Sequence, residues 1–272
     1  HKVVFDHLQM HELHQHLTLL FDLSDPYHMF YQDQSPCLFQ LFFFFLCAVS
    51  LTAYAQREFI QIDTLSWSIK NLDVTTFRNG DEIRNAKTRE EWIECLTSGI
   101  PAYCDYRNDT TLGRIYGHIY NWFAIADPRG LAPNGSRIAN NSDWDELCLF
   151  ASSGMPNWAS YNTIGSALKS KEYWLNARPV RDTLYFNLLP GGYRNSNGEF
   201  GGLGNETAVW VRDAFTYGSR SKGNAYVAPY MLVQGKSDQI LLLSDGRKTG
   251  CYVRLVLGEE YGLNTEKSDK KE

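Results

Sequence analysis

A short apolar run near the start of the chain limits which part of it can fold as a soluble domain. Residues 38–51, within the sequence CLFQLFFFFLCAVSLTAYAQ, are nearly all apolar. A run of this length suits the core of a secretory signal and is short for a transmembrane helix. It is followed by Ala-Tyr-Ala at residues 53–55, the small-x-small pattern that signal peptidase accepts. We therefore predict a signal peptide over residues 37–55, cleavage before Gln56 and export, to the medium, the periplasm or the cell surface.

Two features near this run refine the prediction. Cys47 follows Phe-Phe-Phe-Leu, whereas the residues before a lipidated cysteine are normally small, so we favour a soluble exported protein over a lipoprotein. No Lys or Arg stands just before the run, and the chain begins with His rather than Met. We interpret residues 1–36 as a doubtful leader that reflects a misplaced start or a fragment.

Histidines are concentrated in this leader. It holds six of the seven in the chain: His1, His7, His11, His14, His16 and His28. Closely spaced imidazoles at positions 11, 14 and 16 could share a cation. Nothing else in the leader resembles a folded module, so we expect no metal site there.

The composition after the signal is that of a soluble globular domain. Residues 56–272 hold 25 basic and 26 acidic residues, and no basic cluster is interleaved with aromatic residues. Nucleic acid is therefore not an expected partner. Aromatic residues make up 14% of the chain, which predicts a large aromatic core or an aromatic binding surface. We expect one domain over residues 56–260, a disordered charged tail over 261–272 and no membrane span after signal cleavage.

Four cysteines follow the signal: Cys95, Cys104, Cys148 and Cys251. An exported chain can oxidise them, and four cysteines allow three pairings. Their spacing matches no zinc pattern. Cys148 lies on an apolar helical face with Trp144 and Leu147, so we favour a small buried core residue over a disulfide at that position.

Capping residues and apolar spacing predict helices in the first half of the domain. Thr88 and a Glu three residues later form a capping box for a helix over 88–97. Ser142 is expected to cap a second helix over roughly 143–152. A short third helical segment is expected within 160–172.

Strands are expected at both ends of the domain. Early strands are predicted over 57–77, a polar loop over 101–113, and strand or buried core over 116–125. The later strands, separated by glycine turns, are expected in TLYFNLLP (183–190), GGYRNSNGEFGG (191–202), AVWVRDAF (208–215), QILLLSD (239–245) and CYVRLVL (251–257). Two or three helices early and short antiparallel strands late predict an α+β domain.

Several phrases together resemble the Fibrobacter succinogenes major paralogous domain family of exported bacterial proteins. They are WSIKNLDVTTFRNGDEI (67–83), PAYCDYRNDTTLGRIYGHIYNWFAIADPRGLAPNG (101–135), SDWDEL (142–147), LPGGYRNSNGEF (189–200) and GCYVRLV (250–256). The order and number of these blocks make the resemblance specific. It implies a C-type-lectin-like fold, related to that of formylglycine-generating enzymes, and an activity that is largely undefined. Fold alone does not fix function.

The chain departs from this family at two usual cysteine positions. Ala132 stands at one and Leu255 at the other. The joint loss implies that a family disulfide is missing here while the frame is kept. The unusual segment 136–141 leaves the local packing open.

The sequence contains few residue patterns that would indicate a catalytic or a metal-binding site. His118 is the single histidine after the signal, and we interpret it as packed or hydrogen-bonded rather than as a general base. A thiol-oxidising site would need two late cysteines, and the late part of the chain has one. The Glu-Pro-Asn, Gln-Pro-Asp and Trp-Asn-Asp strings of calcium-dependent lectins are absent. Two sets of oxygen-bearing residues could hold calcium, although turns favour such residues anyway: Asp105, Asn108 and Asp109, and Asn195, Asn197 and Glu199.

The leading hypothesis is therefore a non-catalytic binding domain for a glycan or a surface protein, with no cofactor. Its candidate ligand-binding residues combine aromatic faces with polar groups: Tyr193, Arg194, Asn195, Trp210 and Tyr217. Trp210 and Tyr193 could instead belong to the core. A structural subunit of a surface assembly is the alternative, and an exposed apolar edge strand would favour it. A hydrolytic enzyme is a third hypothesis, for which the sequence shows no paired carboxylates.

Overall fold

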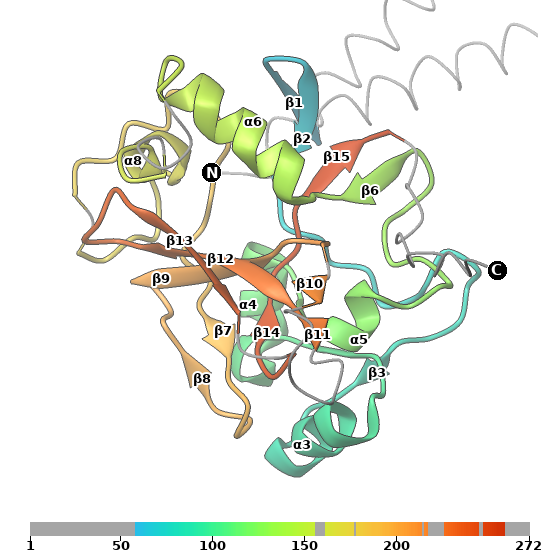
Figure 1. Ribbon diagram of the computed structural model, residues 1–272. Helices are drawn as coiled ribbons and strands as arrows, with labels where there is room; N and C mark the ends of the chain where they lie inside the picture. Colours follow the sequence, from blue (N-terminus) through green and yellow to red (C-terminus); the bar gives the residue numbers. More distant parts are fainter. Residues whose placement is uncertain are drawn as a thin grey trace, which may run out of the picture. The chain divides into compact units, whose positions relative to one another are not determined.

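The computed structural model describes residues 58–155, 161–176, 178–213, 215–216, 226–244 and 247–258 (Figure 1). All of them belong to one compact unit, residues 55–272. The predicted leader, signal peptide and cleavage site lie outside the described residues, as does the predicted tail over 261–272.

A six-stranded sheet joins segments from the first and second halves of the domain. Its strand order is β3 (Arg84–Asn85), β4 (Ala102–Cys104), β5 (Ile119–Asn121), β14 (Gly250–Cys251), β7 (Tyr193–Arg194) and β8 (Phe200–Gly201). The β3–β4 pair is parallel and the other pairs are antiparallel. Because β14 lies between β5 and β7, a late segment of the domain joins the early strands β3–β5 to the hairpin β7–β8.

Smaller sheets make up the rest of the strand structure. One has the order β1 (Phe59–Ile62), β2 (Leu65–Ser68), β15 (Leu255–Leu257) and β6 (Ser136–Ile138). Another has the order β13 (Ile240–Ser244), β12 (Pro229–Gln234) and β9 (Glu206–Trp210), and a two-stranded ribbon joins β10 (Phe215–Thr216) to β11 (Tyr226–Val227). The architecture is thus α+β and mostly strand.

The helices are short and lie mainly in the first half of the domain. They are α3 (Arg89–Ser98), the 3-10 turn η2 (Tyr106–Asn108), α4 (Thr110–Tyr116), α5 (Trp122–Ile125), α6 (Asn141–Ala151) and α8 (Gly165–Leu168). No helix among the described residues is long and apolar enough to cross a membrane. In Figure 1, α6 lies beside β15 and β6, and α3 lies at the opposite end of the domain.

The cap of α3 is the one predicted from the sequence, whereas the cap of α6 is a different residue. The predicted capping box of α3 is confirmed: Thr88 accepts from the amide of Glu91, whose carboxylate accepts from the amide of Thr88. The predicted Ser142 cap of α6 is wrong. Asn140 caps the helix instead, in a reciprocal pair with Asp143, and Asp143 also binds Arg137. The helix therefore begins at Asn141, two residues before the predicted start at residue 143.

Two segments differ from the predicted secondary structure. The expected polar loop over 101–113 contains β4 and the start of α4, which Asp109 caps by accepting from the amide of Thr111. The expected strand over 183–190 is irregular. Tyr185 and Asn187 both have a φ of 53°, a left-handed backbone that interrupts extended pairing.

Aromatic side chains fill the core. Trp122 is 3% exposed and packs edge-on against Trp210 with ring centres 5.4 Å apart, so the prediction that it is buried is confirmed. Emptying such a site costs about 3–5 kcal/mol. Ala132 and Leu255, where the family resemblance implies two cysteines, belong to the same apolar core as Trp122.

All four cysteines that the structure describes are buried, and none of them forms a disulfide. Cys148 is fully buried on the inner face of α6, which confirms it as a small core residue. Burial raises the pKa of its thiol to about 12, so this residue is unreactive at neutral pH.

Candidate functional site

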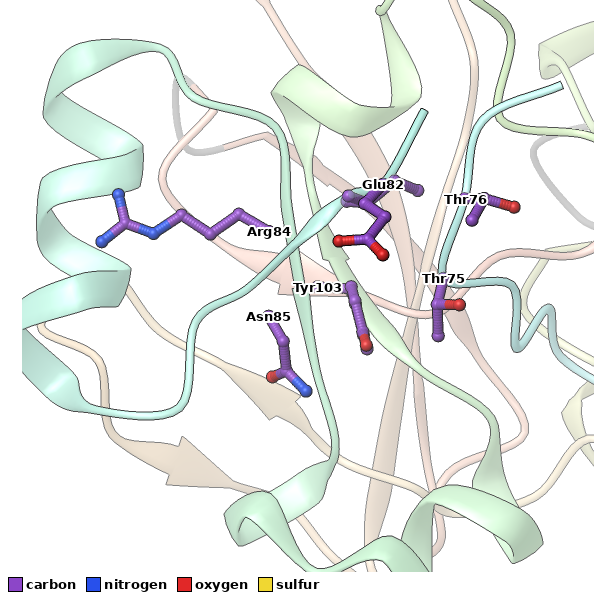
Figure 2. A pocket seen from close by; sticks show the side chains of 7 residues that line it. Thr75, Thr76, Glu82, Arg84, Asn85 and Tyr103 are labelled. Carbon is purple, nitrogen blue, oxygen red and sulfur yellow. The ribbon is translucent and has the colours of Figure 1, made fainter. Parts of the chain in front are cut away.

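A polar pocket of about 450 Å³ lies beside the parallel β3–β4 pair (Figure 2). Its lining combines two hydroxyls, an amide, a carboxylate, a guanidinium, an aromatic ring and one aliphatic side chain: Thr75, Thr76, Asn85, Glu82, Arg84, Tyr103 and Ile83. The volume falls in the range of small-molecule sites.

A tight turn builds one wall of this pocket. Thr76 and Glu82 form an antiparallel bridge, and the amide of Ile83 donates to the carbonyl of Thr75 at 2.9 Å. At the tip of the turn, Gly80 has a φ of 92°, a conformation that a side chain would strain. The turn therefore presents Thr75, Thr76 and Glu82 on one wall.

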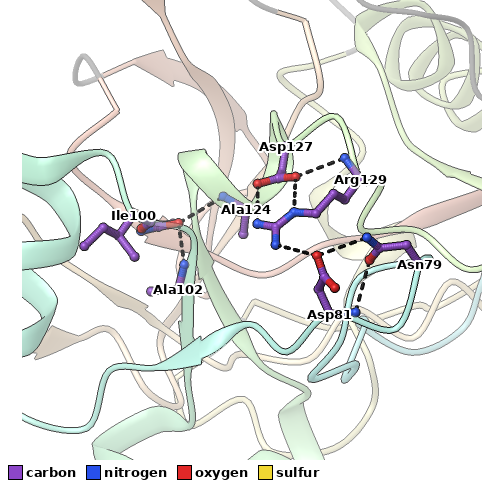
Figure 3. Close-up of polar contacts among 8 residues, drawn as sticks. Asn79, Asp81, Ile100, Ala102, Ala124, Asp127 and Arg129 are labelled. Atoms are coloured by element: carbon purple, nitrogen blue, oxygen red, sulfur yellow. Dashed lines mark hydrogen bonds and ion pairs between the residues drawn. The ribbon is translucent and has the colours of Figure 1, made fainter.

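A charged network holds this turn in place (Figure 3). Asp81 accepts from the guanidinium of Arg129 at 3.0 Å, and Arg129 also binds Asp127 at 2.8 Å. The guanidinium lies 4.0 Å from the centre of the Phe77 ring. Asn79 donates to Asp81 at 3.0 Å. Arg129 and Asp127, in the segment that follows α5, thus hold this wall of the pocket in place.

A buried amide positions the part of the pocket that β4 forms. Asn121 is fully buried, accepts from the amides of Ala102 and Ala124 and donates to the carbonyl of Ile100 at 2.8 Å. Figure 3 shows these bonds around Ile100, Ala102 and Ala124. They fix the start of β4, and so the ring of Tyr103 that faces the pocket.

The charges of the pocket point in different directions. Arg84 extends toward α3, where its guanidinium binds Glu94 at 2.7 Å, whereas Glu82 directs its carboxylate to the side on which Tyr103 and Thr75 lie (Figure 2). Burial raises the pKa of the Tyr103 phenol, a hydrogen bond from Asn85 lowers it, and the carboxylates of Asp105 and Glu82 raise it further. The phenol therefore stays neutral at physiological pH.

His118 lies behind the pocket and does not line it. Its ring centre is 4.7 Å from that of Tyr103, and its Nδ1 lies 2.8 Å from Oδ1 of Asp105. This confirms the prediction of a packed, hydrogen-bonded histidine.

The two oxygen-bearing sets predicted as calcium candidates are engaged in hydrogen bonds within the domain. Asp105 faces His118, Asn108 donates to the carbonyl of Lys87, and Asp109 caps α4. The second set is bonded within the β7–β8 hairpin, where the amide of Glu199 donates to Asn195 and Asn197. Within the described residues, no group of three or more His, Cys, Asp or Glu side chains could hold a metal ion.

Two of the predicted ligand-binding residues are interior residues, which corrects the prediction. Arg194 is 1% exposed, donates to the carbonyls of Ala86, Thr88 and Gly198, and lies against the rings of Trp92 and Phe200. Trp210 is fully buried, and its indole N–H donates to the carbonyl of Tyr120 at 2.8 Å. Neither side chain presents a face to a ligand, because its polar atoms are bonded inside the domain.

The other predicted residues do not form a common site either. Tyr193 is half-buried and packs over Gly201. Asn195 is also half-buried, and its side chain bonds within the hairpin. Tyr217 lies outside the described residues. The structure thus brings Tyr193 and Arg194 together as parts of the sheet rather than as a binding surface.

Fold and site together define the class of protein: an α+β domain, mostly strand, that carries a polar pocket beside a parallel strand pair. Residues 60–256 match the Fibrobacter succinogenes major domain, and the chain belongs to this family. The family predicted from the sequence phrases is thereby confirmed. No match was found among curated proteins or among solved structures.

Sequence reasoning missed every residue that lines the pocket. The available signal was the dipeptide Asn79-Gly80, a turn former flanked by polar residues. It predicts a turn but not the pairing of β3 with β4 that completes the pocket.

Proposed function

We propose that the chain is an exported, non-catalytic binding domain with a C-type-lectin-like fold, and that it binds a glycan through the pocket beside β3 and β4. One observation carries this proposal: hydroxyl, amide and carboxylate groups line the same pocket of about 450 Å³ as an aromatic ring. Sugars offer many hydroxyls and an apolar C–H face, which such a lining complements. No metal or cofactor forms part of the proposal.

The distribution of carboxylates supports binding rather than hydrolysis. Glycoside hydrolysis needs two carboxyl groups on opposite sides of the scissile bond. Glu82 is the single carboxylate among the pocket-lining residues. The His118–Asp105 pair lies behind Tyr103 and outside the lining, so it supplies no base to a molecule in the pocket.

A glycan array probed with the purified full chain tests the proposal. The wild type should retain a defined group of glycans, and Thr76→Val and Asn85→Ala should each weaken that retention about threefold to tenfold, because each removes one or two hydrogen bonds. Thr183→Val is the matched control, since Thr183 is exposed and lies outside the pocket. Retention that is unchanged in both pocket variants would place the glycan elsewhere.

A second candidate, a structural subunit of a surface assembly, has one observation in its favour. Strand β13 lies at the edge of its three-stranded sheet and carries three consecutive leucines, and Leu242 is 47% exposed. Natural edge strands usually carry a charge, a proline or a bulge that prevents association, and Ile240–Ser244 has neither charge nor proline.

Sedimentation velocity distinguishes this candidate. An assembly through β13 should dissociate with Leu242→Lys and persist with Leu257→Lys, because Leu257 is 46% exposed and belongs to another sheet. A wild type that stays monomeric at high concentration would rule out self-assembly through β13.

A further inference from the structure

The pocket is more acidic than its composition suggests, because its cation is directed away from it. Arg84 and Glu82 both line the pocket. The guanidinium of Arg84 is bound to Glu94 on α3, 2.7 Å away. Figure 2 shows the Arg84 side chain extending toward the helix and the Glu82 carboxylate directed to the side of Tyr103 and Thr75. Among the described residues, no hydrogen bond or ion pair joins the Glu82 carboxylate to a cation.

The other arginines of this segment are engaged elsewhere. Arg129 binds Asp81 and Asp127. Arg78 donates two hydrogen bonds to the carbonyl of Ala132. Neither residue lines the pocket. The carboxylate of Glu82 is thus left as the charge that a ligand meets in the pocket.

The aromatic wall reinforces a preference for a cation. The face of a tyrosine ring attracts an ammonium group, and a nearby carboxylate adds to this attraction. Both Glu82 and Asp105 act electrostatically on Tyr103. Asp105 is occupied by His118, so Glu82 is the carboxylate that can bind directly.

We propose that the pocket selects glycans that carry a free primary amine, with the ammonium group bound by Glu82 beside the Tyr103 ring. The hydroxyls of Thr75 and Thr76 and the amide of Asn85 then bind neighbouring sugar hydroxyls. This proposal rests on the glycan binding proposed above and adds a preference for sugars that carry an amine. An N-acetylated sugar of the same backbone keeps the hydroxyls but loses the charge, so it lacks the contact with Glu82.

Titration calorimetry with two sugar trimers tests this assignment on the purified full chain. One probe is a β-1,4-linked glucosamine trimer with free amines and the other is its fully N-acetylated counterpart, both at mildly acidic pH where the amine carries its proton. The wild type should bind the amine trimer about threefold to fivefold more tightly, because Glu82 is exposed and one ion pair at an exposed carboxylate adds at most about 1 kcal/mol. The preference should shrink between about 0.05 M and about 0.5 M salt, because salt screens the charge pair.

Glu82→Gln should abolish the preference while leaving the affinity for the acetylated trimer within about twofold, because it removes the charge and keeps the shape. Glu172→Gln is the control, since Glu172 is exposed and outside the pocket, and it should keep the preference. Equal or tighter binding of the acetylated trimer by the wild type overturns the amine assignment and leaves glycan binding intact. An array on which no glycan is retained, with neither trimer binding, overturns both.

Discussion

The guanidinium of Arg194 lies 4.7 Å from the centre of the Trp92 ring and thereby ties strand β7 to helix α3. The two residues are more than a hundred positions apart in the chain. The indole N–H of Trp92 donates to the carbonyl of Asn195, the neighbour of Arg194. A residue that sequence reasoning assigned to a ligand is therefore a central contact of the fold.

Replacing Arg194 by Met should destabilise the domain by about 3 kcal/mol or more, because buried carbonyls would lose their donor. Arg194→Lys should recover only part of this loss, since an ammonium cannot reproduce the planar fork of a guanidinium. Urea unfolding measures both effects. Arg178→Met, at an exposed position, is the control and should change stability by no more than about 0.5 kcal/mol. A loss that small in Arg194→Met would show that the buried contacts contribute little.

The family disulfide should be restorable. Ala132 and Leu255 are buried in the same apolar core, so Ala132→Cys with Leu255→Cys should form a bond if the two α-carbons lie within about 7 Å. Cys251→Ser is included because the Cys251 thiol could capture a new cysteine. Closing so long a loop can stabilise by roughly 4–5 kcal/mol, although strain often removes much of the gain. Mass spectrometry under oxidising conditions measures the bond. Two thiols that stay free would show that the family alignment of these segments is wrong.

The network that braces the pocket turn should weaken in acid. Hydrogen bonds from Arg129 hold the pKa of Asp127 below 3.8, its ordinary value. Because the folded pKa is depressed, the stabilisation is fully present above the unfolded pKa and is lost as pH falls through the folded pKa. The stability difference between wild type and Asp127→Asn should therefore be constant near neutrality and shrink below pH 3.8. Urea unfolding across this range measures it, and a difference that stays constant or grows in acid would contradict the role of Arg129.

The predicted cleavage site can be tested independently of the fold. Exported material should begin at Gln56, because the apolar run followed by Ala-Tyr-Ala predicts cleavage there. N-terminal sequencing of the secreted or periplasmic fraction measures this. An intact leader on protein that stays in the cytoplasm would contradict it.

Local features of the fold were predictable from sequence, and long-range ones were not. The capping box of α3 involves residues three apart, so Thr88 and Glu91 reveal it. At α6, Asn140 and Ser142 are both residues that commonly cap helices, so the sequence alone does not decide between them. In the structure Asn140 is the cap, and its partner Asp143 is also bound by Arg137.

At the candidate site, too, the long-range contacts could not be predicted from the sequence. Arg194 lies in a glycine-rich hairpin that looks like a surface loop, yet carbonyls from the segment before α3 bury it. Hydrophobic spacing carries no information on such partners. The pocket likewise needs β3 to pair with β4, a contact between short segments that no periodicity marks.

Amide chemical-shift mapping of the full chain, with a glycan retained on the array, shows directly whether the pocket beside β3 and β4 is the binding site. Binding in the pocket predicts that the largest shift changes fall at residues 75–76 and 82–85 and at Tyr103, which line the pocket. Changes that fall instead in the β7–β8 hairpin or along β13, with the pocket amides unmoved, would show that the glycan does not bind in the pocket.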